Sequence, residues 1–322
     1  MEKLKLSLLQ KWELPEQYSF VHSSALLSDG RVLILTSETD DSDKYCVLVL
    51  SSSDIKKIEI CNCNEDRRNY PVLFRFEEGF GIIKKGQQCE YYTGDFSSPE
   101  RLSIKNGDSV LQNIVPKKAQ QRYFQVTSDS SLIPVCFENN VYYGDARCFA
   151  LLEFDITKKY AEWKSFSNID KKAFTHRDDR RDETPKIDSL KIANREIYAF
   201  LSGESTTSVN KWGMDYYALA KISADGTVVE KFLESDNLKQ SSKKGGVNGV
   251  FTDSDYVVMT PLFKTDEWKG KQKLFSLTVR KYFDIGLPRG VSKHKVQNIS
   301  GDSCITSLYN RGLKEVALCK IG

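Results

Sequence analysis

The chain lacks any long apolar run. No segment approaches the roughly 18 apolar residues of a membrane-spanning helix. The first residues, MEKLKLSLLQKWEL, hold lysines but neither an uninterrupted apolar core nor the small-residue cleavage site of a signal peptide. We therefore expect this segment to be part of the fold, the protein to be cytoplasmic, and no membrane among its partners.

An excess of charge of one sign is also missing. The 322 residues include 47 basic and 44 acidic side chains, which gives a formal net charge of +3. Proteins that bind nucleic acid through their bulk charge are strongly basic. We therefore expect no nucleic-acid partner. A local basic patch is the alternative that the overall charge leaves.

Sequence motifs of catalysis are absent as well. There are three histidines, and we find no nucleophile elbow, phosphate loop, dinucleotide fingerprint or two-histidine metal motif. The acidic run TDDSD at 39–43 lacks the glycine and final glutamate of calcium loops. We expect no cofactor and no metal, and the sequence favours a protein without enzymatic activity.

The eight cysteines are scattered through the chain, and most lie in apolar runs. This distribution is typical of reduced cysteines in a core and favours the cytosol. The close pair Cys61 and Cys63, in the sequence CNC, lacks the spacing and the second ligand pair of a zinc site. We interpret both as ordinary residues at the end of a strand.

What the sequence does contain is a repeated hairpin. YYALAKISADGTVVEKF, residues 216–232, has two alternating apolar segments around an Asp-Gly turn. Similar segments begin at Tyr45, Cys89, Cys148 and Lys273, and the first half recurs at Glu315. A second hairpin with a short polar turn precedes each of them, for example ALLSDGRVLIL and LKIANREIYAF. The pattern predicts six units of four strands.

The spacing of these units is that of propeller blades. Equivalent positions lie 44, 59, 68, 57 and 42 residues apart, within reach of a repeat of 40 to 50 residues with insertions. The sequence resembles the β-propeller superfamily over the whole chain, without the kelch, WD or Asp-box motifs. The resemblance implies one all-β domain, 1–322, with blades at about 19–62, 71–104, 122–166, 187–233, 247–286, and 295–322 plus 4–14.

The N-terminal strand supplies the strand that the last unit lacks. Residues 4–14 would pair with EVALCKIG at the C-terminus and close a six-bladed ring, which removes free sheet edges. Seven blades remain an alternative if residues 107–121 hold an extra unit, although so few residues cannot form four strands.

The long insertions are expected on one face of the propeller, among the loops between second and third strands and the links between blades. Such a concentration indicates a binding face. Trp212 and Trp268 occupy nearly equivalent loop positions in adjacent units, and exposed tryptophan is a frequent hot spot. The alternative is that each indole covers its own blade. We predict a partner site with these two anchors, surrounded by Tyr142, Tyr143, Arg177, Arg180, Asp266 and Lys269.

The inner strands offer a different kind of site, because they line the axis of a propeller. The polar residues expected there are His22, Arg75, Arg122, Asp188 and Asn248. One histidine and one aspartate are few for hydrolysis, since glycoside hydrolysis normally needs two acids. Polar linings are also usual where inner strands meet a wet channel, and we favour that interpretation.

We therefore predict a platform that recognises a protein or peptide, of the scaffold, immunity or effector type, and that is a monomer by itself. Near-neutral charge and mixed aromatic and charged loops suit a polar rim around a few anchors. The alternative is a carbohydrate-active or carbohydrate-binding propeller that uses the mouth of the channel. A purely structural repeat protein is a third possibility, and it predicts buried tryptophans.

Overall fold

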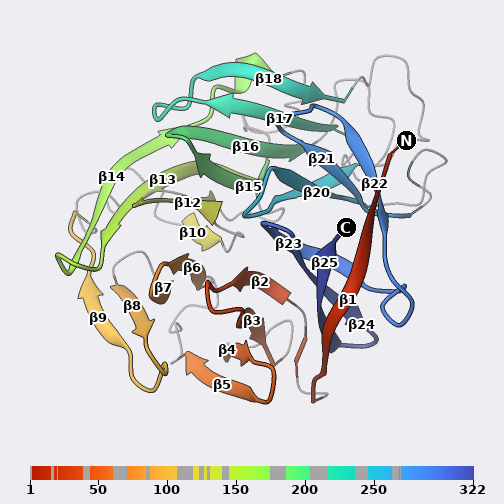
Figure 1. Ribbon diagram of the computed structural model, residues 1–322. Coiled ribbons are helices and arrows are strands. Elements are labelled where there is room, and N and C mark those ends of the chain that lie inside the picture. Colours follow the sequence, from red (N-terminus) through yellow and green to blue (C-terminus); the bar gives the residue numbers. More distant parts are fainter. Residues whose placement is uncertain are drawn as a thin grey trace. The chain divides into compact units, whose positions relative to one another are not determined.

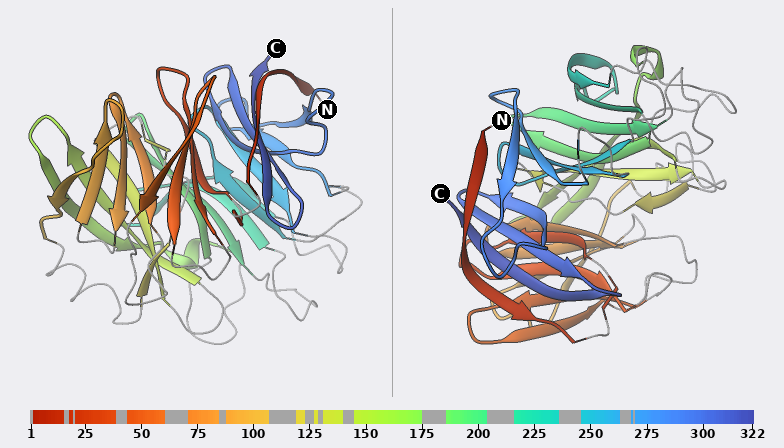
Figure 2. Two further views of the ribbon diagram at one scale, coloured as in Figure 1. Left: turned by 90° about the horizontal axis from the view of Figure 1, so that it is seen from below. Right: turned by 90° about the vertical axis from the view of Figure 1, so that its right-hand side faces the viewer.

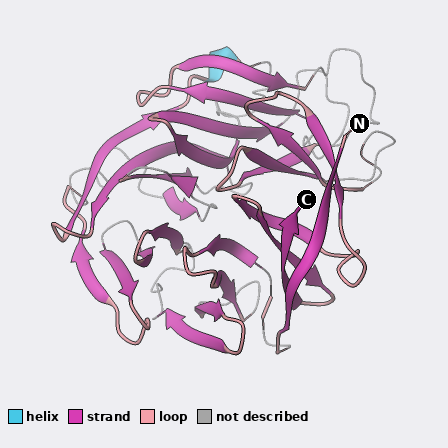
Figure 3. Cartoon of the chain, viewed as in Figure 1, coloured by secondary structure: helices cyan, strands magenta, loops and turns pink. Residues whose placement is uncertain are grey.

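The structure is a computed structural model in which β-strands make up nearly all of the regular structure (Figure 3). One short 3-10 helix, Lys171–Ala173, is the only helix among the residues described, and none there is long and apolar enough to cross a membrane. The structure describes residues 2–15, 18–19, 21–38, 44–60, 71–84, 88–106, 119–122, 127–128, 131–139, 145–174, 186–203, 216–235, 246–262, 268 and 270–322.

The chain divides into two compact units. The first comprises Met1–Arg101, Thr252–Val258 and Lys273–Gly322, and the second comprises Leu102–Phe251 and Met259–Gln272. Most neighbouring strands are antiparallel, and in two of the four-stranded sheets the strands follow one another in chain order throughout (Figure 1).

The first unit begins with two four-stranded sheets. Their strands are β2 (Val21–Leu26), β3 (Val32–Ser37), β4 (Tyr45–Leu50) and β5 (Ile55–Ile60), then β6 (Val72–Phe76), β7 (Gly79–Lys84), β8 (Gln88–Thr93) and β9 (Glu100–Ser103). The central strands VLILTS and YCVLVL are buried at every residue, whereas the outer strand β5 alternates. Continuous burial of this kind requires cover on both faces of a sheet.

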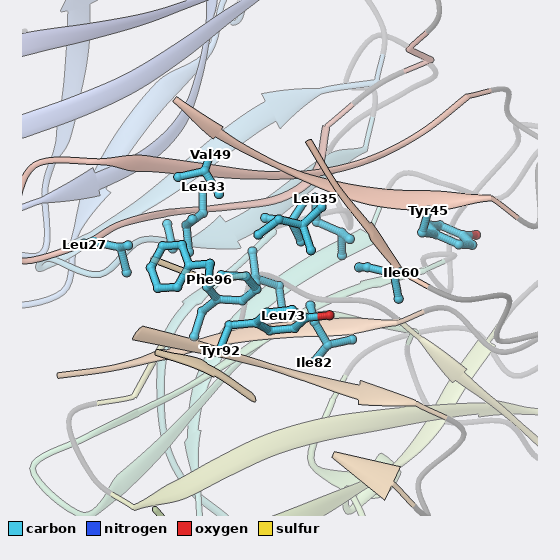
Figure 4. Packing of buried hydrophobic residues seen from close by; sticks show 14 residues of the cluster. Leu27, Leu33, Leu35, Tyr45, Val49, Ile60, Leu73, Ile82, Tyr92 and Phe96 are labelled. Atoms are coloured by element: carbon cyan, nitrogen blue, oxygen red, sulfur yellow. The ribbon is translucent and has the colours of Figure 1, made fainter. Parts of the chain in front are cut away.

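The cover on one face comes from the neighbouring sheet. Side chains of β3 and β4, including Leu33 and Val49, form one cluster with Leu73, Ile82 and Tyr92 of the β6–β9 sheet (Figure 4). On the other face, Ile34 and Leu48 pack with Trp12 and Val316, which lie on strands of the sheet that contains both ends of the chain. The first unit therefore stacks three sheets face to face.

The N-terminal strand β1 (Lys3–Glu13) joins strands from the far end of the chain. Leu6–Glu13 pair antiparallel with β25 (Leu313–Ile321), and Lys3–Lys5 pair parallel with β22 (Tyr282–Gly286). Figure 2 shows β1 running beside both strands. The predicted pairing of the N-terminal strand with the C-terminal one is confirmed.

This pairing creates an eight-stranded sheet with the order β19-β20-β21-β22-β1-β25-β24-β23. Its other members are β19 (Val247–Phe251), β20 (Tyr256–Pro261), β21 (Lys273–Ser276), β23 (Lys295–Ser300) and β24 (Ser303–Tyr309). Apart from the three parallel pairs of β1 with β22, the sheet consists of four strands on either side of that junction.

The second unit contains a four-stranded sheet and a five-stranded one. Their strands are β10 (Ala119–Arg122), β12 (Leu132–Asn139), β13 (Asp145–Asp155) and β14 (Tyr160–Asn168), then β11 (Thr127–Ser128), β15 (Lys186–Ala193), β16 (Glu196–Gly203), β17 (Tyr216–Ile222) and β18 (Val228–Glu234). The third blade was predicted to begin at about residue 122. Its first described strand, β10, ends at Arg122 and pairs with β12 at the edge of the sheet.

The hairpin of residues 216–232 shows why these connections are tight. Gly226 has φ +87, a left-handed conformation that favours glycine, and an added Cβ would lie 1.8 Å from the Asn168 carbonyl oxygen. The Asp225 carboxylate accepts the Thr227 backbone N–H at 3.0 Å. The turn joins β17 to β18, the outer half of a sheet, as the sequence predicted. Taken together, the four- and five-stranded sheets of the chain give an all-β, propeller-like architecture.

Candidate functional site

Most of the predicted partner-binding residues fall outside the described part of the chain. These are Trp212, Tyr142, Tyr143, Arg177, Arg180, Asp266 and Lys269. Trp268 is described, and its side chain is buried, with 3% of the residue exposed. Trp268 is therefore no exposed anchor, and its burial fits the alternative in which the indole covers its own blade. The large apolar area of the indole favours this burial.

The predicted channel residues divide between the two units. His22 and Arg75 belong to the first unit, and Asp188 and Asn248 belong to the second. Arg122 is described only through its backbone, which pairs with Cys136 at the end of β10.

His22 is a buried residue of β2. Its Nε2 lies 2.8 Å from the Ser37 Oγ, and its ring lies 5.2 Å from the ring of Tyr45. Burial lowers the pKa of His22 to about 3. A base with so low a pKa takes up a proton poorly near neutral pH, so His22 is not suited to general base catalysis.

Arg75 belongs to a polar cluster that joins three sheets of the first unit. Its Nε lies 3.3 Å from Asp253 Oδ2, and the Asp253 side chain is only 4% exposed. Asn298, fully buried on β23, donates from Nδ2 to Asp253 Oδ2 and to the Ser24 carbonyl, both at 3.0 Å. Its Oδ1 accepts the backbone N–H groups of Asp253 and Ile299.

Asn298 thereby uses all four of its hydrogen-bonding positions. Because every partner comes from another strand or turn, apart from the adjacent residue Ile299, the cluster fixes the positions of the inner strands. We interpret Arg75, Asp253 and Asn298 as a structural element, in line with the polar lining expected of inner strands.

In the second unit, Asp188 has a comparable role. Its Oδ1 accepts a hydrogen bond from the Ser202 Oγ at 2.9 Å and lies 3.7 Å from Lys186 Nζ. The next residue, Ser189, donates to the Gly249 carbonyl at 2.8 Å and so ties β15 to β19. The Oδ1 of Asn248 is buried and has no hydrogen-bond partner among the described residues. No group of three or more His, Cys, Asp and Glu side chains there could hold a metal ion.

The first unit contains a groove that the sequence did not indicate. It has a volume of about 360 Å³ and lies between the outer strand β5 and the β8–β9 hairpin. We call it the β5–β9 groove. Its lining residues are Lys56, Lys57, Ile58, Glu59, Glu90, Tyr92, Phe96, Ser97, Pro99 and Arg101.

The apolar side of the groove rests on the core between the first two sheets. Ile58, Tyr92 and Phe96 are all members of that cluster and are nearly buried. The rings of Tyr92 and Phe80 stack with their centroids 4.7 Å apart. The apolar side is therefore rigidly supported from below.

The turn that carries Phe96 has an unusual backbone. Phe96 has φ +59, which is uncommon for a bulky residue. Its N–H donates to the Thr93 carbonyl at 3.1 Å, and its ring lies 4.1 Å from the guanidinium carbon of Arg31. Burial of the ring and this cation–π contact offset the cost of the left-handed conformation.

Beneath the charged side of the groove lies Glu90, whose side chain is 5% exposed. Lys84 Nζ, also nearly buried, lies 2.5 Å from Glu90 Oε2, and Arg101 Nε donates to Oε1 at 3.1 Å. Lys84 alone neutralises the carboxylate, so Arg101, with a side chain 66% exposed, adds a positive charge at the surface. The segment CEYY, an acid inside an apolar strand, was the sequence signal that could have indicated this site.

Comparisons with known proteins identify no family for this chain. No family model matches it, and no curated protein matches its sequence. Among solved structures it is similar to the glutaminyl cyclase of Myxococcus xanthus, at 12% identity and a TM-score of 0.38, with 81% of this chain and 93% of that one covered. It is also similar to YCF48 bound to D1 peptide, at 7% identity and a TM-score of 0.45, with 100% and 98% covered. Neither similarity assigns an activity, a ligand or a partner.

Proposed function

We propose that the protein is a platform that recognises a protein or peptide, and that the β5–β9 groove is one of its binding surfaces. The observation that carries the proposal is the combination of a supported apolar side with a rim of four charged residues, Lys56, Lys57, Glu59 and Arg101, in one concave site. Interfaces are built in this way, with apolar anchors at the centre and polar groups around them.

The size of the groove suits a short segment of a partner. A volume of about 360 Å³ is at the lower end of the range for ligand sites, which is roughly 300–1,000 Å³. A peptide that fills it with a few side chains would continue beyond it over the surface. The predicted loop residues Trp212, Tyr142, Tyr143, Arg177, Arg180, Asp266 and Lys269 stay candidates for a second surface.

We also propose that the sheets form six blades of one closed propeller. Splitting the eight-stranded sheet at the β1–β22 junction gives two blades, and the four remaining sheets give four.

A cytosolic location is part of the same proposal, supported by six buried cysteines without disulfides among the described residues. The alternative of a carbohydrate-active propeller gains no support from His22, because a histidine with so low a pKa is not suited to acid–base catalysis.

Selection from a displayed library of random peptides tests the proposed function. The wild type is compared with Ser97→Trp, in which a large side chain fills the groove from an exposed position. Ser53→Trp, in the exposed β4–β5 turn, is the matched control. We expect clones that bind the wild type and Ser53→Trp but not Ser97→Trp. If the Ser97→Trp variant retains every clone, the groove is not a recognition site.

A further inference from the structure

We propose that the β5–β9 groove accepts an extended acidic segment of a partner protein, which adds as a strand along β5 and places a carboxylate at Arg101. This inference rests on the proposed function and names the chemistry of its partner. Three features of the groove lead to it: an open strand edge, an excess of positive charge and an apolar side.

The open edge belongs to β5. This strand is the last of its sheet and pairs only with β4 within the described part of the chain. Four consecutive residues of β5, Lys56 to Glu59, line the groove. Because successive side chains of a strand point to opposite faces, a site that touches four in a row must border the edge of the strand. An extended segment placed there meets the backbone groups of that edge.

The positive charge that is left over comes from Arg101. Lys57 is balanced by Glu59 at 3.2 Å and Glu38 at 3.7 Å, and Glu90 is balanced by Lys84. Lys56 Nζ donates at 2.6 Å to the Asp95 backbone carbonyl and also interacts with the Asp95 carboxylate, whose pKa is lowered by hydrogen bonds from Ser97 and by the charge of Lys56. Arg101 makes one contact with the already neutralised Glu90, and a guanidinium has five donors.

A carboxylate on the partner would therefore complete the charge balance of the groove. Arg101 suits this role because its planar donors match the two oxygens of a carboxylate. A basic segment would meet repulsion from Arg101, since Glu90, the acid that Arg101 contacts, is already paired with Lys84. The charged edge also discourages pairing of β5 with another copy of itself, as charged edge strands do.

The apolar side adds a second requirement. Ile58, Tyr92 and Phe96 face a peptide lying along β5 from one side of the groove. In an extended peptide, alternate side chains point the same way. Lys56 and Ile58, two residues apart on β5, point to the same face, on which Tyr92, Phe96 and Arg101 of the next sheet also lie. The segment that fits therefore carries its apolar residues, which contact Ile58, Tyr92 and Phe96, and an acidic residue, which contacts Arg101, at every second position on that one face.

The test begins with the peptides selected by the wild type and lost by Ser97→Trp. We expect Asp and Glu to be enriched among them relative to the unselected library. Representative peptides are then synthesised with a fluorescent label, and their affinities are measured by fluorescence anisotropy. Groove-dependent peptides without acidic enrichment would overturn the acidic partner and leave the proposed function standing. No groove-dependent peptide at all would overturn both.

Two variants separate the role of charge from that of folding. Arg101→Gln removes the exposed cation, and we expect affinity for the acidic peptides to fall about fivefold, the effect of losing one exposed ion pair. Arg289→Gln, an exposed arginine outside the groove, is the control and should leave affinity unchanged. Equal affinities of the wild type and Arg101→Gln would contradict the assigned role of Arg101.

Strand addition has its own test. In a strand, alternate N–H groups point to opposite sides, so only one alternate set of peptide amides can bond to β5. Methylation of that set should abolish binding, and methylation of the other set should preserve it. If both methylated peptides bind as well as the parent peptide, the segment is held by its side chains alone and the strand-addition model is wrong.

Discussion

Replacing Asn298 by aspartate tests the polar cluster of the first unit most directly. The substitution keeps the size and shape of the side chain but exchanges a donor for an acceptor. The amide nitrogen that is lost lies 3.0 Å from both the Ser24 carbonyl and Asp253 Oδ2. The new carboxylate would therefore face another carboxylate in a site from which water is excluded, because Asn298 is fully buried.

The size of the effect follows from the contacts that are broken. A buried acceptor left without its donor costs about 1–3 kcal/mol. Arg75 continues to interact with Asp253, so the loss of the Asn298 donor costs that carboxylate about 1 kcal/mol, the lower end of this range. The Ser24 carbonyl loses its side-chain donor, and the cost there is about 3 kcal/mol, the upper end. We expect a loss of at least about 3 kcal/mol at pH 7, or a fall in Tm on the order of 5–10 °C.

The effect should also depend on pH in a known direction. Burial and the carboxylate of Asp253 both raise the pKa of the new carboxyl group above its unfolded value of about 3.9. The folded variant then binds more protons than the unfolded one above that pH. Relative to the wild type, Asn298→Asp therefore loses stability as the pH rises from about 4 and recovers part of it on acidification.

The assay is thermal unfolding followed by circular dichroism at several pH values. Asn106→Asp is the matched control, since Asn106 Nδ2 donates to Glu162 Oε1 at 2.7 Å on the exposed surface. Its backbone, with φ +61, tolerates aspartate. We expect little change in that variant. Equal Tm values for Asn298→Asp and the wild type at pH 7 would refute the cluster as described.

Three further predictions concern the core and the edges. Burial lowers the pKa of His22 to about 3, so below about pH 6.5 the unfolded chain binds a proton that the folded one does not. Wild-type stability should fall on acidification by up to about 1.4 kcal/mol per pH unit relative to His22→Gln, and parallel pH profiles would contradict this. Deletion of residues 2–13 exposes the edges of β22 and β25, and light scattering should detect aggregation; a soluble monomer would show that β1 is dispensable. Burial raises the pKa of Cys46 and Cys148 to about 12, so iodoacetamide at pH 8 should label them only in denaturant; labelling of the native protein, measured by mass spectrometry of peptides, would contradict their burial.

The strands and their order could be predicted from the sequence because local patterns encode them. Apolar runs such as YCVLVL and VLILT, with Asp-Gly turns between strands, define four-stranded hairpin units without reference to distant residues. The pairing of β1 with β25 was also predictable, because an incomplete last unit leaves one strand without a partner. The parallel contact of Lys3–Lys5 with β22 was not, since no local pattern marks it.

The candidate site illustrates what sequence patterns leave out. The sequence left two alternatives for Trp268, an exposed anchor or an indole that covers its own blade, because burial of an indole depends on neighbours that the loop sequence does not show. The β5–β9 groove joins residues 45 positions apart, Lys56 on one sheet and Arg101 on the next. No periodicity links two such positions.

By itself, the sequence determined the class of fold, the repeat and the pairing of the two ends, because each follows from alternation, turn chemistry and the need to satisfy sheet edges. Only the tertiary structure decided which polar residues are structural and which face a groove. Asn298 and Glu90 both interrupt apolar strands in the sequence. Packing between sheets satisfies all four hydrogen-bonding positions of Asn298. It places Glu90 beneath the exposed Arg101. The difference arises from contacts between sheets, which depend on three-dimensional position rather than on local pattern.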